Sequence, residues 1–175
     1  MLLCLSGSLR RGSYNSALLR EAAGAYGGPW QLADLRLPLY DGDEESETGL
    51  PPPVRTLVEQ IEAAEALVLS SPEYNKMLSG VMKNALDWIS RARPHPLQDK
   101  PVAVLAAAAG VSGGARARYS LLTALVAFRV RFSTGPEVLV GGASRAFDAE
   151  GRLCDPKTRA LLDEAMARLR QEAAG

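Results

Sequence analysis

The chain alternates short, mostly apolar runs with longer amphipathic stretches. The apolar runs are Met1–Leu5, Trp30–Leu35, a run that begins at Ala66, a run that begins at Pro101, and Val138–Val140. Runs that are apolar along nearly their whole length are typical of strands buried on both faces of a parallel sheet. The pattern therefore predicts five buried, parallel strands.

Between these runs, apolar residues recur at the spacing of one helix face. The five stripes are Ala17, Leu18, Ala22, Ala23 and Tyr26; Val54, Leu57, Val58 and Ile61; Val81, Met82, Ala85, Leu86 and Ile89; Leu121, Leu122, Leu125 and Val126; and Leu161, Leu162, Ala165, Met166 and Leu169. Asp155 followed by Pro156 is a typical start for the last helix. The polar, turn-rich stretch between Leu35 and Val54 predicts a long surface loop.

Strands that alternate with helices predict a doubly wound α/β fold with helices on both faces of the sheet. The 175 residues fit one domain, residues 1–175, without a repeat or a linker. Such sheets bind ligands at the carboxyl ends of their strands, near the point where the strand order reverses. Three segments are expected at this edge, residues 6–16, 71–80 and 107–116. Their side chains decide what the protein binds.

The charge balance excludes some classes of partner. The chain has 20 basic and 20 acidic residues, so its formal net charge is zero, which argues against nucleic acid or a membrane surface as a partner. No apolar run approaches the roughly 20 residues that span a bilayer. Cys4 and Cys154 match neither a zinc pattern nor a disulfide framework, and no signal peptide precedes the first strand. We therefore expect a soluble, cytoplasmic protein without a bound metal.

The first of the three loops, LSGSLRRGSYN at residues 5–15, is rich in small hydrogen-bond donors. A loop between a strand and a helix gathers unpaired backbone N–H groups and the positive end of the helix dipole, so it suits an anion. Gly7 and Gly12 allow a close backbone approach, and Arg10 adds a cation. The side-chain donors are Ser6, Ser8, Ser13, Asn15 and Ser16. As a set they predict a site for a terminal phosphate, although any one serine is equally a turn or cap residue.

Other phosphate loops fit this segment less well. Gly7 and Gly12 have the spacing of a Walker loop, but Ser13 stands where that loop needs lysine, and the GxGxxG dinucleotide pattern is absent. Cys4 and Arg10 have the Cx5R spacing of phosphatases that use a thiolate nucleophile, with Asp155 as a potential acid. Leucines flank Cys4 on both sides, which favours a packed thiol, so a small Cys-dependent phosphatase stays a secondary alternative.

The second loop is SPEYNKMLSGVMKNALDWISR, which begins at the end of the third predicted strand. Pro72, Glu73, Tyr74 and Asn75 would place backbone donors and one aromatic ring over a flat ligand whose phosphate lies in the first loop. That combination describes a mononucleotide with a planar ring system. Tyr74 alone is equally explained as an aromatic residue at the rim.

GSLRRGSYN and PEYNKMLSGVMKNALDWISR resemble the two signatures of the NADPH-dependent FMN reductases, and GGARARY resembles their third. These are flavodoxin-like flavoproteins that include quinone, chromate and azo-dye reductases, and the resemblance spans essentially the whole chain. It implies a three-layer sheet of five parallel strands in the order 2-1-3-4-5, and FMN as cofactor. Family members are usually homodimers or homotetramers.

The resemblance also implies a role for each loop. The FMN phosphate would be held by Ser8, Arg10, Ser13, Asn15 and Ser16, and the isoalloxazine would be lined by Pro72, Glu73, Tyr74 and Asn75. Backbone groups of the third loop would meet the pyrimidine edge, at Ala107, Ala108, Gly110, Gly113 and Gly114. Relatives often have serine where this chain has Ala107 and Ala108, so one hydroxyl contact is lost.

The activity implied is a two-electron, ping-pong transfer of hydride from NADPH or NADH through FMN to quinones, free flavin, chromate or azo compounds. No side-chain acid or base is required, because the cofactor carries the redox chemistry. The alternative from another class is a flavodoxin-type electron carrier that binds FMN without turning over nicotinamide. Such carriers look strongly acidic, whereas this chain is neutral and has Arg10 in its first loop. The choice between NADPH and NADH and the physiological acceptor stay open.

Overall fold

A computed structural model describes residues 1–175 and contains one parallel sheet. The strands are β1 (Leu2–Ser6), β2 (Trp30–Leu32), β3 (Ala66–Ser70), β4 (Pro101–Ala107), β5 (Arg131–Phe132) and β6 (Leu139–Val140). They lie in the order β2-β1-β3-β4-β5, and every pairing is parallel. This confirms the predicted order 2-1-3-4-5, which is that of the flavodoxin-like fold.

The fifth position of the sheet is divided between two short strands. β5 pairs with the start of β4 through Pro101 and Val102, and β6 pairs with its end through Ala106 and Ala107. The sequence predicted one strand near Val138–Val140. That prediction corresponds to β6, and it missed β5. Pro136 lies between the halves and has no N–H for a ladder, so the chain leaves the sheet there.

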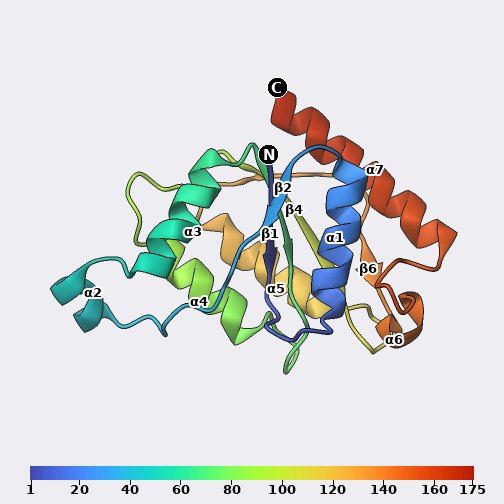
Figure 1. Cartoon of the computed structure of the whole chain (residues 1–175), viewed down its shortest axis with the longest axis horizontal. Helices are drawn as coiled ribbons and strands as arrows, with labels where there is room; N and C mark the ends of the chain where they lie inside the picture. The colour runs from blue at the N-terminus through green and yellow to red at the C-terminus, as the bar shows by residue number, and fades with distance from the viewer.

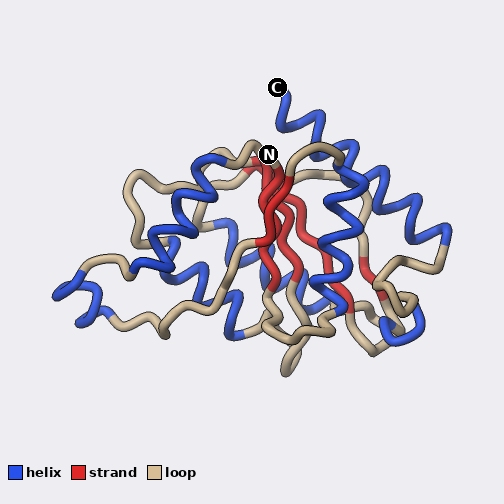
Figure 2. Tube along the Cα trace, viewed as in Figure 1, coloured by secondary structure: helices blue, strands red, loops and turns tan.

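Helices cover both faces, as predicted, and give three layers (Figures 1 and 2). α1 (Tyr14–Tyr26) and α7 (Pro156–Ala174) lie on one face, where they pack against each other and the sheet. α3 (Pro52–Ala63), α4 (Gly80–Ile89) and α5 (Ala115–Val126) contribute to the apolar cluster of the other face. The one-turn helix α6 (Ala143–Ala146) follows β6. None of these helices combines the length and the apolar character that crossing a membrane requires.

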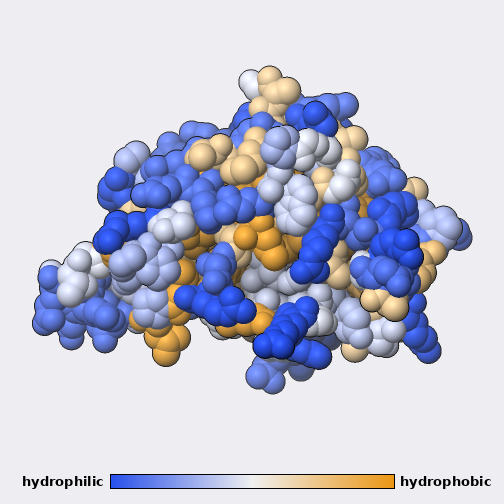
Figure 3. All heavy atoms as spheres, in the orientation of Figure 1, coloured by the Kyte–Doolittle hydropathy of each residue, from blue (hydrophilic) through white to orange (hydrophobic).

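The expected long loop before Val54 contains a helix, α2 (Gly42–Thr48), so that part of the prediction was wrong. Asp41 caps this helix by accepting from the Asp43 N–H at 2.9 Å. None of its residues is buried, and it projects from the body of the molecule with a hydrophilic surface (Figures 1 and 3). A helix without a buried face leaves no hydrophobic period in the sequence, which explains why the pattern did not reveal it.

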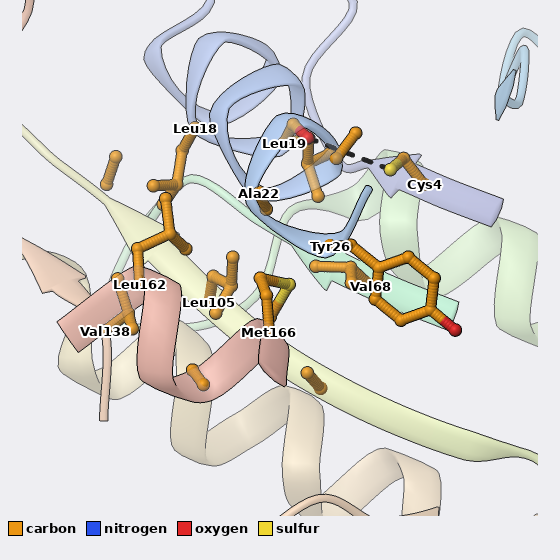
Figure 4. Close-up of a cluster of buried hydrophobic side chains, with 14 of the residues drawn as sticks. Cys4, Leu18, Leu19, Ala22, Tyr26, Val68, Leu105, Val138, Leu162 and Met166 are labelled. Atoms are coloured by element: carbon orange, nitrogen blue, oxygen red, sulfur yellow. Dashed lines mark hydrogen bonds between the residues drawn. The ribbon is translucent and has the colours of Figure 1, made fainter. Parts of the chain in front are cut away.

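Most of the predicted core residues are buried in two clusters, one on each side of the sheet, and a few are partly buried. Figure 4 shows part of the α1 and α7 side, where Leu18, Leu162 and Met166 pack together. Two members of the predicted stripes are instead exposed, Val126 by 64% and Leu161 by 41%. Both lie next to a residue that is fully buried, Leu125 and Leu162, so each stripe is narrower than the sequence suggested.

Candidate functional site

The three predicted loops meet at the carboxyl ends of β1, β3 and β4, along the lower edge of the sheet in Figure 1. They surround a hollow of about 220 Å³, here called the main cavity. Its lining includes nine of the residues predicted from the sequence: Ser8, Arg10, Ser13, Asn15, Pro72, Glu73, Tyr74, Ala107 and Ala108. Ser16, Asn75, Gly110, Gly113 and Gly114 do not line it, whereas Tyr14 and Ala109, which were not predicted, do.

The backbone of the first loop carries a group of unused hydrogen-bond donors. The N–H groups of Leu9 and of residues 11–15 have no acceptor within the chain. Residues 14 and 15 form the first turn of α1, where the helix dipole adds a partial positive charge. Arg10 is exposed and makes no ion pair. This donor set suits a phosphate group.

Asn15 fastens the first loop to the sheet. Its side-chain amide donates to the Ala107 carbonyl at 2.9 Å, and its oxygen accepts from the Ala107 N–H at 3.0 Å and from the Ser70 hydroxyl at 2.7 Å. The side chain is only 3% exposed. Its bonds therefore hold the start of α1 against the ends of β3 and β4.

Ser13 and Ser16 also make bonds within the loop. The Ser13 hydroxyl accepts from the Ser16 N–H at 3.2 Å and so caps α1, while the Ser16 and Ser6 hydroxyls are 2.8 Å apart. A cap role, which the sequence left open beside phosphate binding, is thus visible for Ser13, whereas Ser16 links α1 to the end of β1. A capping hydroxyl keeps a proton to donate, so Ser13 retains a hydrogen bond for a ligand in the main cavity.

The second loop is tied to the first at its base. The Ser79 hydroxyl donates to the Gly7 carbonyl at 2.6 Å, and the Ser71 hydroxyl accepts from the Ser79 N–H at 2.9 Å. A Cβ on residue 7 would lie 2.7 Å from the Ser79 oxygen, which explains the glycine. The two loops therefore form one rigid wall of the site.

The tip of the second loop is a tight hairpin between Tyr74 and Met77, with two backbone hydrogen bonds of 3.1 Å. Asn75 and Lys76 form the turn with φ of 51° and 68°, a conformation that Asn adopts more readily than most residues. Tyr74 lines the main cavity and is 50% exposed, whereas Asn75 lies at the turn, outside the lining. The hairpin thus presents an aromatic ring at the mouth of the cavity.

Glu73 connects the second loop to the third. Its carboxylate accepts from the Arg116 N–H at 3.1 Å and lies 3.5 Å from the Arg116 guanidinium, at the start of α5. The Glu73 side chain is 15% exposed. Glu73 thus links the second loop to the start of α5 through Arg116.

The third loop is held against β6 by backbone bonds. The Ala108 N–H donates to the Val140 carbonyl at 3.0 Å, and the Ala143 N–H donates to the Ala108 carbonyl at 3.0 Å. Gly113 has a φ of 60°, and a Cβ there would lie 2.8 Å from the Leu139 carbonyl carbon. The N–H groups of Ala109, which lines the main cavity, and of the neighbouring Gly110 have no acceptor within the chain.

Replacing Gly113 by Ala is expected to destabilise the protein by about 2 kcal/mol or more, because the left-handed backbone and the crowded Cβ both disfavour a side chain. The matched control is Gly110→Ala in the same loop, since Gly110 has nothing within 4 Å of a new Cβ. Urea unfolding of the two variants measures the difference. Equal midpoints would contradict the close packing of the loop on β6.

The phosphatase alternative is wrong. Cys4 lies inside β1, is 0% exposed, and directs its sulfur toward the Leu19 carbonyl of α1 at 3.9 Å (Figure 4). Burial raises the pKa of the Cys4 thiol to about 12, because the charged thiolate is disfavoured away from water. A protonated thiol within the core cannot attack a phosphate ester.

Comparison with known proteins agrees with this geometry. The family described as NADPH-dependent FMN reductase matches residues 1–145. The chain is 47% identical to an NAD(P)H-dependent FMN reductase of Pseudomonas aeruginosa, covering 96% of this chain and 92% of that protein. It is 36% identical to a quinone reductase of Escherichia coli K12, with 93% and 85% covered.

A solved structure is similar over the whole chain. FerB, a flavoenzyme NAD(P)H:(acceptor) oxidoreductase from Paracoccus denitrificans, superimposes with a TM-score of 0.88 and 28% sequence identity, covering 99% of this chain and 96% of that one. The sequence match, the shared fold and the phosphate-suited first loop lead to one assignment. The chain belongs to the NADPH-dependent FMN reductase family.

Proposed function

We propose that this protein is an FMN-dependent NAD(P)H oxidoreductase that delivers electrons to small acceptors such as quinones. The observation that carries the proposal is the first loop, where six backbone N–H groups without acceptors and the unpaired Arg10 surround the start of α1. A phosphate monoester satisfies such donors. FMN carries this group at one end and a planar ring at the other.

The rest of the main cavity fits the ring. Pro72, Glu73 and Tyr74 line it from the second loop, and Ala107 and Ala108 line it from the third. The free N–H groups at Ala109 and Gly110 are suited to stabilise negative charge on the ring edge, as oriented donors do in other active sites. Asn15, Ser16 and Gly113 would act by shaping the loops, and Asn75 by forming the hairpin turn.

Bound FMN supplies the redox chemistry, accepting two electrons as hydride from NAD(P)H and yielding two to an acceptor. The chain's own part would be to hold the phosphate with the first loop and to hold the ring between the second and third loops. Nicotinamide and acceptor would then have to approach the ring at the same mouth of the cavity in turn, which predicts ping-pong kinetics. No residue of the cavity is required to transfer a proton.

The domain organisation, the cellular location and the oligomeric state are proposed from the family resemblance and the charge balance. We propose a single domain over residues 1–175 that works in the cytoplasm as a homodimer or homotetramer, with NADPH or NADH as co-substrate. A net charge of zero supports the absence of a nucleic-acid or membrane partner.

The test is to incubate the protein with excess FMN, remove free flavin by gel filtration, and titrate the yellow protein with NADPH and NADH without oxygen. Retained colour, bleaching by nicotinamide and recovery with a quinone are the expected results. Riboflavin, which lacks the phosphate, is the matched control and should be retained far less. A colourless protein would overturn the proposal, and retained colour that does not bleach would favour the electron-carrier alternative.

A further inference from the structure

The helix α2 and the chain that leads into it have few contacts with the rest of the molecule. None of the α2 residues is buried, and Leu39, just before the helix, is 82% exposed. Residues 37–53, here called the acidic arm, contain five acidic residues and no Lys or Arg. Figures 1 and 3 show α2 projecting from the body with a hydrophilic surface. A helix of seven residues is marginal on its own in water, so a contact outside the chain would stabilise it.

The acidic arm is fastened to α4 at its root. The Trp88 indole N–H donates to the Pro38 carbonyl at 2.8 Å, and the Arg91 guanidinium lies 2.8 Å from the Glu45 carboxylate. The other carboxylates of the arm form no ion pair, and they belong to Asp41, Asp43, Glu44 and Glu47. The arm thus combines a fixed position with unpaired negative charge.

Complementary positive charge lies in a second hollow, beside the main cavity. Its volume is about 230 Å³, and it opens between α1 and the chain that follows β2. It is called the arginine cavity here, because its lining includes Arg10, Arg11, Arg20 and Arg36. Asp34 is the single acidic residue in the lining, and it already accepts from Arg36 at 3.2 Å. Four guanidinium groups and one carboxylate leave an excess of three positive charges.

The acidic arm and the arginine cavity do not meet within one chain. No ion pair joins a carboxylate of the arm to an arginine of the cavity. The chain runs from Arg36, in the cavity, to Gly42, where α2 begins, and its attachment to α4 directs α2 away from the cavity (Figure 1). In a dimer with a two-fold axis, two such surfaces meet twice, each arm against the cavity of the other protomer.

We propose that this protein forms a two-fold dimer in which the acidic arm of each protomer docks in the arginine cavity of the other. The unpaired carboxylates of α2 then face Arg20 and Arg36, with which they form charge-assisted hydrogen bonds. The proposal rests on the oligomer in the proposed function, for which it assigns the contact surface. It does not depend on which nicotinamide or acceptor the protein uses.

Two further features fit this contact. Leu39 of the arm and Leu9 of the cavity lining are 82% and 44% exposed, so docking removes apolar surface from water as well as pairing charges. Ser8 and Arg10 line both the arginine cavity and the main cavity. The docked arm therefore lies beside the first loop, and each FMN site borders on the other protomer.

The first experiment reverses the charge of each surface separately in the FMN-loaded protein. The arm variant is Glu44→Lys/Glu47→Lys, and the cavity variant is Arg20→Glu/Arg36→Glu. Analytical ultracentrifugation should show the dimer dissociation constant raised about 100-fold or more in each variant, because like charges then face each other. An equimolar mixture of the two variants should recover the dimer, because both contacts of the mixed dimer again join opposite charges.

The matched control for the arm variant is Glu59→Lys/Glu62→Lys on α3. Glu59 and Glu62 are also exposed, have the same spacing and form no ion pair, so the change in net charge is identical. The control should leave the dissociation constant within about twofold. Raising the salt concentration from about 0.05 M to about 0.5 M should weaken the wild-type dimer about tenfold or more. Circular dichroism verifies that every variant is folded.

Three results would overturn the proposal. Arm and cavity variants that dimerise as tightly as the wild type would assign the dimer to other surfaces. A mixture that stays monomeric would show that the two surfaces do not contact each other. A control that weakens the dimer as much as the arm variant would reduce the effect to net charge. Failure of the proposed redox function is distinct, since the protein would then not bleach with nicotinamide, whatever its oligomeric state.

Discussion

Ser13→Asp is expected to weaken FMN binding by about 100-fold or more, because it places a negative charge among the donors that would hold the phosphate. Ser13 lines the main cavity and caps α1 through the Ser16 N–H. Asp caps helices as well as Ser does, and a carboxylate at this end of a helix is favoured by the dipole. The same change should therefore leave the unfolding midpoint of the flavin-free protein unchanged or slightly raised.

The matched control is Ser13→Asn, which has the shape of Asp and also caps a helix but carries no charge. Fluorescence titration with FMN gives the two affinities, and urea unfolding gives the two stabilities. A loss of FMN affinity in the Asp variant alone, with stability retained, is the signature of a phosphate site. Equal FMN affinities for the Asp and Asn variants would place the phosphate elsewhere and remove the main support for the proposed function.

The strands themselves and the three loops were predictable because β1, β3 and β4 are buried along their whole length. Such strands leave continuous apolar runs in the sequence, and the ends of parallel strands meet at one edge. The resemblance then supplied the order of the strands and the roles of the loops. The strand β6, which forms the second half of the fifth position in the sheet, was predicted for the same reason, since Val138 and Val140 are buried.

What the sequence did not reveal depends on contacts between distant residues. Arg20 lies on α1 and Arg36 follows β2, and neither position has a local pattern that marks it for one cavity. Tyr14 lines the main cavity from the first turn of α1, where it also stacks on Phe147 with the ring centroids 5.9 Å apart. The amide of Asn15 bonds to Ala107, 92 residues away, which no helix-start pattern indicates.

Asn15 is expected to be the polar side chain on which the fold depends most. Replacing it with Leu, which has the same branching and the same number of side-chain heavy atoms, removes three hydrogen bonds and leaves the N–H and C=O of Ala107 and the hydroxyl of Ser70 unpaired. Ala107 is 2% exposed and Ser70 0%, so water does not reach these groups. The expected loss is about 3 kcal/mol or more in the free energy of unfolding, because each of the three buried groups left unsatisfied costs about 1 to 3 kcal/mol.

A second substitution, Ser70→Ala, distinguishes the loss of hydrogen bonds in Asn15→Leu from a poor fit of the new Leu side chain. Ser70→Ala alone should cost about 1 kcal/mol, because it removes one hydrogen bond and leaves the other bonds of Asn15 intact. In the Asn15→Leu background the same change should instead stabilise, since it removes a hydroxyl that has already lost its acceptor. Urea unfolding of the four proteins completes this cycle. Additive losses would mean that Asn15 and Ser70 act independently, and the start of α1 would then be held to the sheet by apolar packing alone.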